Sequence, residues 1–461
     1  MRKFCFVLVL ILLTTIQSFA QSSGKPTDFT ALEETVLAEL KEKRAAGAAV
    51  AIVRNDQIVF AKGFGTANVE TNQPVTPDML FQIGSITKTF TALAVTSFAA
   101  EGKLRLDVPV GNYVKGLSPK LSQVNLSQLL SHTAGIIDEP DEYGAQDESL
   151  MATYLRSWKD EYCLFEPSEI FSYSNSGFAL AGFTMQEAVG KPYVEIMNER
   201  VFAPLRMTRT TFRPTVAMTY PLAVGHKSAE QLTVVRPLPN DARLYPAGTA
   251  YSSANELARF AIAFLNNGRL DGKRIIAPAV IKQMSEPRAQ QLSAPDDTSY
   301  GYGLFMNHAG GMRRIWHEGS MTGYVAMMMF VPERHVAVIV LSNTDGVVLD
   351  KTEEKALELM LPSAVKEEPK AKTVQSVSEA EIKNYVGTYS QPNRWKTEVF
   401  IKEGRLFIKE FNREMPLNKI GENRFSFEFP KPGINQEISF KLGSDDKPIA
   451  LNQYVWAFKR L

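Results

Sequence analysis

The spacing of hydrophobic residues changes several times along the chain and indicates where strands and helices lie. Strand-like apolar runs occupy residues 49–54 and 57–63 and return from 301 to 342, whereas the stretch from about 108 to 267 is mostly helical and rich in loops. Strands at both ends with helices between them predict one antiparallel sheet flanked by helices, with an inserted helical subdomain. The expected fold class is therefore α/β, in the form of an α+β sandwich.

Local signals refine several of these elements. A helix is expected over 30–43, with Thr30 and Glu33 forming a capping box at its start. Asn55-Asp56 suits a hairpin turn between the first two strands. Two apolar runs on either side of Pro332-Glu-Arg334 predict a second hairpin, at the edge of the sheet.

The pattern changes again after residue 362. Residues 363–378 are polar and contain proline, which is typical of a linker. From 379 to 461 short alternating runs separated by turns predict a small C-terminal antiparallel β-barrel domain, next to a main domain over 21–362. The aromatic residues of the C-terminal domain, including those of Val455-Trp-Ala-Phe-Lys-Arg460, are expected to form its core rather than a ligand site.

The first twenty residues are typical of a secretory signal peptide. Arg2 and Lys3 precede an apolar run over 4–13, and small residues up to Ala20 suit cleavage by a signal peptidase. We therefore expect an exported protein, periplasmic or extracellular, that keeps no stable membrane span after cleavage. An uncleaved anchor is the alternative.

Composition narrows the range of partners. The 461 residues include 51 Lys+Arg and 50 Asp+Glu, and no dense basic run indicates a nucleic-acid partner. Cleavage after the signal would leave Cys163 as the single cysteine, so no internal disulfide is expected. The histidines show no metal-ligand spacing, so neither a metal nor a cofactor is expected.

Ser85-Ile-Thr-Lys88 is the most informative chemical feature of the chain. It opens an apolar helical run, and three residues make almost one helical turn, so Lys88 falls on the same face as Ser85. A serine hydroxyl must lose its proton as it attacks, and a lysine amine that burial keeps partly neutral could accept it. The same spacing occurs in linker or turn segments at Ser22, Ser363 and Ser444, so spacing alone does not separate a nucleophile from an ordinary helix face.

A polar stretch from Phe171 to Gly177 precedes another apolar helix. Its loop could present Tyr173 and Asn175 into a cleft, the phenol to move a proton and the amide to hold a substrate carbonyl. Serine and asparagine before a helix are also ordinary caps, so this stretch has a purely structural alternative.

His317-Glu-Gly319 lies at the end of a strand that leads into the second hairpin. Gly319 removes a side chain where a substrate could approach the backbone closely. A histidine in this position is, taken alone, equally typical of a surface or a core.

In this order and spacing, Ser85-Ile-Thr-Lys88, Tyr173-Ser-Asn175 and His317-Glu-Gly319 resemble the serine β-lactamase and penicillin-binding-protein superfamily. The resemblance is to its class C-like branch of D-peptidases, esterases and β-lactamase-related hydrolases. Leu129-Leu-Ser-His-Thr-Ala-Gly135 and Pro246 to Leu257 fit the same family. The end of the chain is similar to the lipocalin-like C-terminal domain found on some of these hydrolases.

The resemblance implies a role for each matched residue. Ser85 would be the acylated nucleophile, Lys88 its base and Tyr173 the group that relays a proton, with the choice of base between Lys88 and Tyr173 left open. Asn175, His317 and Gly319 would bind substrate.

Two further residues are placed by the same resemblance. The backbone N–H groups of Ser85 and Ser320 would form an oxyanion hole. His132 would be architectural rather than catalytic.

The resemblance also bears on the substrate. Many relatives have Lys-Thr-Gly where this chain has His317-Glu-Gly319, and that lysine and threonine help to bind a carboxylate. Penicillin hydrolysis is therefore the less expected activity. We expect an exported serine hydrolase that forms an acyl-enzyme with a small-molecule or peptide substrate, peptidoglycan-derived peptides included. It would act as a D-aminopeptidase, a D-Ala carboxypeptidase-like peptidase or a small-ester esterase, with a β-lactamase and a non-catalytic penicillin-binding-type sensor or scaffold as alternatives.

Overall fold

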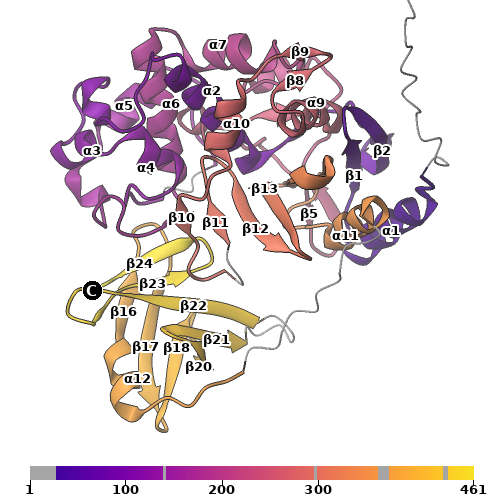
Figure 1. Ribbon diagram of the computed structural model, residues 1–461. Coiled ribbons are helices and arrows are strands. Elements are labelled where there is room, and N and C mark those ends of the chain that lie inside the picture. Colours follow the sequence, from indigo (N-terminus) through magenta and orange to yellow (C-terminus); the bar gives the residue numbers. More distant parts are fainter. Residues whose placement is uncertain (1–26, 139–141, 295–297, 362–372, 429–434) are drawn as a thin grey trace, which may run out of the picture.

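The computed structural model describes residues 27–138, 142–294, 298–361, 373–428 and 435–461. A large domain of sheet and helices is followed by a smaller β domain that lies against one side of it (Figure 1). The predicted signal peptide and residues 363–372 of the predicted linker lie outside the described residues. Within the described ranges, no helix has the length and apolar character needed to cross a membrane.

A nine-stranded antiparallel sheet forms the centre of the large domain, in the order β10-β11-β12-β13-β14-β15-β1-β2-β3. Its strands are β1 (Gly47–Arg54), β2 (Gln57–Asn68), β3 (Gln73–Pro74), β10 (Ala289–Gln290), β11 (Ser299–Tyr300), β12 (Phe305–Ala309), β13 (Met312–Met321), β14 (Tyr324–Val331) and β15 (Val336–Ser342). The predicted fold class, with one antiparallel sheet built from both ends of the segment, is confirmed. The predicted edge position of the β14–β15 hairpin is wrong, because β13 pairs with β14 and β1 pairs with β15.

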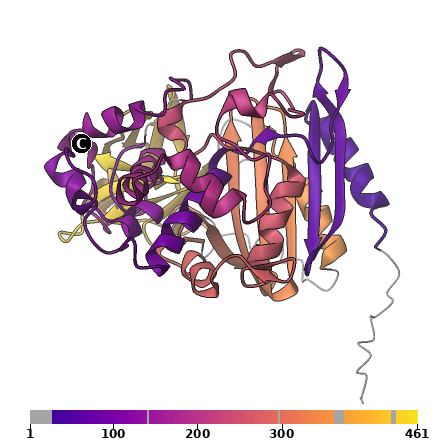
Figure 2. The same ribbon diagram turned by 90° about the horizontal axis from the view of Figure 1, so that it is seen from above.

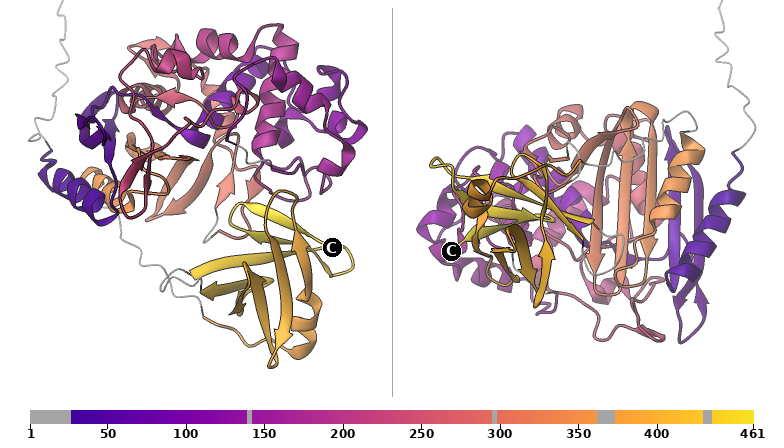
Figure 3. Two further views of the ribbon diagram at one scale, coloured as in Figure 1. Left: turned by 180° about the vertical axis from the view of Figure 1, so that it is seen from behind. Right: turned by 90° about the horizontal axis from the view of Figure 1, so that it is seen from below.

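Helices cover both faces of this sheet and form the inserted subdomain, which lies at one end of the sheet in purple (Figure 2). They are α1 (Thr30–Glu42), α2 (Thr87–Ala100), α3 (Pro119–Gln123), α4 (Leu126–Leu130), α5 (Leu150–Arg156), α6 (Asn175–Val189), α7 (Tyr193–Met197), α8 (Pro214–Ala217), α9 (Ala254–Leu265), α10 (Pro278–Met284) and α11 (Asp350–Met360). Successive strand residues point to opposite faces. On one face Val50 and Ile52 pack with α1 and α11, which lie side by side (Figure 3). On the other, Ala51 and Ile339 belong to the core that contains α2 and α9.

The capping box predicted for α1 is not formed, because Thr30 is already the first helical residue and the residue before it provides no capping side chain. Phe29 precedes the helix, and the Thr30 N–H donates to Asp28 Oδ1 at 2.9 Å. Glu33 instead pairs with Lys62 of β2, with 2.6 Å between the charged atoms. The Glu33 N–H, which a capping threonine would have bound, instead donates to the backbone oxygen of Phe29 at 3.0 Å.

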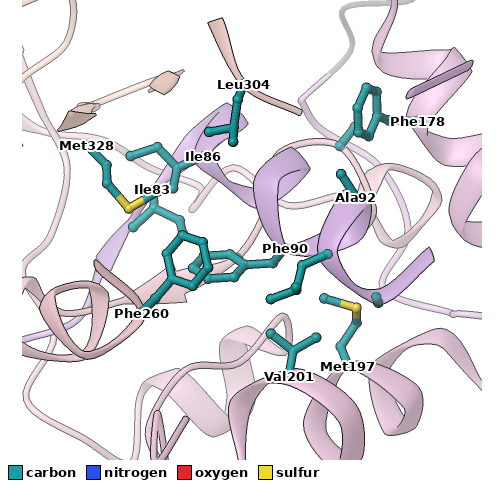
Figure 4. Close-up of a cluster of buried hydrophobic side chains, with 14 of the residues drawn as sticks. Ile83, Ile86, Phe90, Ala92, Phe178, Met197, Val201, Phe260, Leu304 and Met328 are labelled. Carbon is teal, nitrogen blue, oxygen red and sulfur yellow. The ribbon is translucent and has the colours of Figure 1, made fainter. Parts of the chain in front are cut away.

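The helix α2 is buried along almost its whole length in the main core. Phe90 packs edge-on against Phe260 of α9 at 5.0 Å, among Phe178 of α6 and other apolar side chains (Figure 4). Packing on every side fixes the position and rotation of α2. This core therefore holds in place Lys88, in the first turn of α2, and Ser85, just before the helix.

The C-terminal domain is a nine-stranded antiparallel sheet in the order β19-β18-β17-β16-β24-β23-β22-β21-β20. Its elements are α12 (Glu379–Tyr385), β16 (Gly387–Ser390), β17 (Lys396–Lys402), β18 (Arg405–Glu410), β19 (Arg413–Pro416), β20 (Asn418–Gly421), β21 (Arg424–Glu428), β22 (Asn435–Leu442), β23 (Pro448–Gln453) and β24 (Trp456–Arg460). The first strand pairs with the last, so the sheet curls into a nearly closed barrel around Tyr389, Phe440 and Phe458. The predicted antiparallel β-barrel is confirmed, and its likeness to a lipocalin stays a prediction.

Candidate active site

Ser85 lies in a single 3-10 turn, Gly84–Ile86, at the entry to α2. Gly84 has a φ of +51°, a left-handed conformation that glycine adopts without steric cost. A Cβ atom at Gly84 would also lie only 2.5 Å from Ser320 N. The turn therefore brings the backbone of the serine directly against β13.

Lys88 lies one turn further along, and its side chain is fully buried. Its Nζ is 3.0 Å from Ser85 Oγ and donates to Asn175 Oδ1 and Ala247 O, both at 2.6 Å. Burial lowers the pKa of Lys88 from 10.5 to about 7, and Asp138 opposes this shift. A neutral amine has two N–H donors and one lone pair. Because two carbonyl oxygens take the donors, the lone pair is left for the proton of Ser85.

Tyr173 and Asn175 come from the start of α6. Ser174 is the cap of this helix, since its Oγ accepts from Gly177 N at 2.9 Å. The structural alternative for this stretch is thus met by Ser174 alone. Asn175 is the first helical residue, and its amide oxygen reaches Lys88.

The Tyr173 ring lies beside Lys88 of α2 and close to Ser85. Its centroid is 4.7 Å from Lys88 Nζ. Burial raises the pKa of Tyr173 well above 10, although a hydrogen bond with Ser85 lowers it. The phenol is therefore protonated at neutral pH, so it can donate a proton but is not poised to accept one.

His132 packs behind Tyr173 rather than into the site. Its ring centroid is 4.1 Å from that of Tyr173, and its Nδ1 accepts from Ser174 N at 3.0 Å. Burial lowers the pKa of His132 well below 6.5, so the ring is neutral. These contacts match the architectural role that the family resemblance implies.

His317 lies on the part of β13 that extends beyond its pairing with β12, which ends at Trp316. Burial lowers the pKa of His317 to about 3, so the imidazole carries no charge at neutral pH. Its Nδ1 is 2.6 Å from Glu318 O and its Nε2 is 3.0 Å from Tyr300 Oη. Both ring nitrogens have protein partners, and His317 supplies no positive charge for a substrate carboxylate.

Gly319 is required by the turn of the nucleophile rather than by the approach of a substrate. A Cβ atom there would collide with Ile83 O and lie 2.9 Å from Ser85 N. The expectation that Gly319 makes room for a substrate is therefore corrected, because it makes room for Ile83 and Ser85. The same closeness makes the N–H groups of Ser85 and Ser320 neighbours, as an oxyanion hole requires.

Gly319→Ala is expected to lower kcat by about a hundredfold or more, the cost of losing one oxyanion donor, because the added methyl pushes β13 away from Ser85. Steady-state kinetics together with a thermal melt would check this. Gly177→Ala is the matched control, since its Cβ would meet its nearest neighbours at 3.5 Å. Equal activity of both variants would contradict the argument.

The cavity in front of Ser85 has a volume of about 380 Å³, ordinary for a small-ligand site. We call it the catalytic cavity. Its walls come from both domains. The large domain supplies Ser85, Tyr173, Asn175 and, from β13, His317 and Ser320, and the C-terminal domain supplies Arg394, Val455 and Trp456. Trp456 packs against the core of the C-terminal domain, as predicted for its aromatic residues, and it also lines this cavity.

One buried carboxylate that the sequence did not point to links these parts. Asp138 Oδ1 accepts from Asn175 N at 2.8 Å, and its Oδ2 accepts from Arg394 and, at 3.1 Å, from Trp456 Nε1. Asp138 belongs to no motif, and its C-terminal partners lie 256 and 318 residues away. Nothing in the local pattern could have identified this group.

Metal and thiol chemistry have no support among the residues that the structure describes. No group of three or more His, Cys, Asp or Glu side chains there is arranged to hold a metal ion. Cys163 is free and half-buried, and burial raises the pKa of its thiol to about 11.

Comparisons with known proteins bear on the family and the fold of this chain. Among curated relatives, Protein flp of Staphylococcus aureus (strain N315) is 24% identical over 335 residues, which are 70% of this chain and 64% of that protein's length. Penicillin-binding protein 4 of Amycolatopsis lactamdurans is 27% identical over 331 residues, which are 69% of this chain and 86% of that protein. The solved structure of SurE with D-Leu has a TM-score of 0.75 at 24% identity and covers 94% of this chain and 99% of its own.

The family itself follows from the large domain. A family model described as Beta-lactamase matches residues 31–359. This range contains Ser85 and Lys88, the start of α6 and the part of β13 that carries His317. Proteins of this fold are typically serine hydrolases. The chain belongs to the Beta-lactamase family.

Proposed function

We propose that the protein is an exported serine hydrolase that cleaves amide or ester bonds through an acyl-enzyme on Ser85. The observation that carries this proposal is the buried Lys88 amine, 3.0 Å from Ser85 Oγ with a pKa lowered to about 7. The apolar segment after Arg2 and Lys3 supports export. Intact Met1 on protein recovered from the cell envelope would argue against it.

The geometry supports a balanced two-step reaction. Lys88 takes the hydroxyl proton as Ser85 Oγ attacks the substrate carbonyl, and the oxyanion forms at the N–H groups of Ser85 and Ser320. Tyr173 donates its proton to the leaving amine or alcohol as the bond breaks, and regains a proton from Lys88. Lys88, which is neutral again, then takes a proton from an attacking water and returns it to Ser85 Oγ as the ester bond breaks, which releases the acid.

The charges around the catalytic cavity bear on the substrate. Among the described lining residues, His317 is neutral and Arg394 is already paired with Asp138. Glu142 and Glu318 line the same cavity, although burial raises the pKa of Glu318 and so weakens its negative charge. A substrate that is neutral or carries an ammonium group near the scissile bond therefore fits better than one with a carboxylate there. This favours a D-aminopeptidase or a small-ester esterase over a D-Ala carboxypeptidase or a β-lactamase.

A matched substrate series tests this proposal. D-Ala and D-Leu anilides with a free, an acetylated or a succinylated amine would be compared with p-nitrophenyl acetate and a chromogenic cephalosporin. We expect kcat/KM for the free-amine or acetylated forms to exceed that for the succinylated form by about tenfold or more, since a carboxylate would meet acidic walls.

Each other outcome has a definite reading. A preference for the succinylated form would overturn the charge argument, and turnover of the cephalosporin alone would make the protein a β-lactamase. Covalent labelling of Ser85 by a fluorophosphonate without turnover of any substrate would identify a penicillin-binding-type sensor.

A further inference from the structure

We propose that Arg394 and Trp456 of the C-terminal domain are positioning residues for the catalytic machinery, which they hold and balance through the buried carboxylate of Asp138. The inference rests on the proposed function, because it concerns how Ser85 is activated. It assigns the C-terminal domain a part in catalysis that goes beyond lining the catalytic cavity.

The contacts form one continuous chain from the barrel to the base. Arg394 stacks on the Trp456 ring, 3.9 Å from its centroid, and both donate to Asp138 Oδ2. Asp138 Oδ1 accepts from Asn175 N, the first N–H of α6. The amide oxygen of Asn175 in turn accepts from Lys88 Nζ at 2.6 Å. A shift of the barrel is therefore transmitted to the amine that activates Ser85.

The turn between β23 and β24 holds the same segment from its other side. Tyr173 N donates to Val455 O at 2.8 Å, and Ala457 N donates to Ser172 Oγ at 3.1 Å. A backbone hydrogen bond therefore joins the barrel directly to Tyr173, the proposed proton donor. Two independent sets of contacts place the segment from Tyr173 to Asn175.

The positive charge of Arg394 also affects the protonation of Lys88. Asp138 is fully buried, and an unpaired carboxylate there would stabilise the protonated form of Lys88. The other titratable groups near Lys88 are Tyr173, His132 and His317, all uncharged at neutral pH, with Glu142 and Glu318 on the cavity wall. Arg394 is thus the cation that offsets Asp138.

A double-mutant cycle in the full-length protein tests this, with kcat/KM measured against pH. Arg394→Met leaves Asp138 without its cation, so the acidic limb of the profile should move to higher pH by about half a unit or more, with about a twofold or larger loss at pH 7. Asp138→Asn leaves the cation alone and should move the limb to lower pH. The double variant removes both charges and should return the limb close to its original position.

Lys459→Met is the matched control. Lys459 Nζ donates to Leu164 O at 2.9 Å, an interdomain contact that does not reach Asp138. We expect no shift of its pH profile. If all four profiles coincide, or if the control shifts as Arg394→Met does, the two residues only dock the domains and the proposal is wrong.

Two further arms keep the test decisive. If Arg394→Met does not fold, Trp456→Phe removes one donor from Asp138 while keeping an aromatic ring, and should give a smaller upward shift; no shift would overturn the proposal. Labelling of the unmodified protein by a fluorophosphonate separates the two hypotheses. Absence of labelling at Ser85 refutes the proposed function, whereas coincident profiles with labelling intact refute only the positioning role.

Discussion

Ser85→Ala should abolish hydrolysis of every amide and ester substrate, with a loss of about 10⁴-fold or more, because it removes the hydroxyl that forms the proposed acyl-enzyme. It should also abolish covalent labelling by a fluorophosphonate. In the native protein, this label should add the mass of one phosphonyl group to the peptide that contains Ser85. Mass spectrometry of the labelled digest and steady-state rates check the two expectations.

The chain offers its own control for this experiment. Ser444 has the same spacing from Lys447 as Ser85 has from Lys88, but it follows β22 in a turn. Ser444→Ala should keep full labelling and turnover. If the Ser85→Ala variant hydrolysed substrates at the rate of the native protein, the acyl-enzyme mechanism would be refuted.

Lys88→Met should lower turnover by about a hundredfold or more, the range of a positioned proton acceptor, and at the same time stabilise the fold. The folded pKa of Lys88, about 7, lies below its ordinary value of 10.5, so the unfolded chain binds an extra proton between these pH values. Stability of the native protein therefore decreases as the pH falls from about 10.5 to about 7. The methionine variant lacks this penalty, and thermal melts at pH 7 and pH 10 should show its advantage at the lower pH only.

Lys88→Arg provides the contrast. Its guanidinium stays protonated and would be buried in the same place, so this variant should be inactive and less stable than the native protein. If the methionine variant melts at a lower temperature than the native protein at pH 7, burial does not depress the pKa of Lys88 as the structure indicates.

The regular parts of the fold were accessible from the sequence because local patterns specify them. Alternating apolar runs gave the strands β1 and β2 within a few residues, and the repeating turns after 379 predicted the barrel. The position of the β14–β15 hairpin was not accessible in this way. Its neighbours in the sheet are set by pairing with β1, almost three hundred residues earlier, and pairing at that separation leaves no mark in the hairpin itself.

In the candidate site, too, contacts between residues close in sequence were predictable, whereas contacts between distant residues were not. Ser85 and Lys88 lie within one helical turn, so their meeting follows from helix geometry, and Tyr173 and Asn175 lie at a visible helix start. Arg394 and Trp456 reach Asp138 only because the barrel docks on the large domain. The neutral state of His317 likewise depends on burial by residues remote in sequence.

The β23–β24 hairpin, residues 448–460, has a consequence for the timing of synthesis. A nascent chain that has emerged as far as α11 already contains Ser85, Lys88 and Tyr173, yet it still lacks the backbone carbonyl of Val455 and the indole of Trp456. The large domain is therefore synthesised before the residues that complete the wall of its catalytic cavity. The active site stays incomplete until the whole chain has been made and the C-terminal domain has docked.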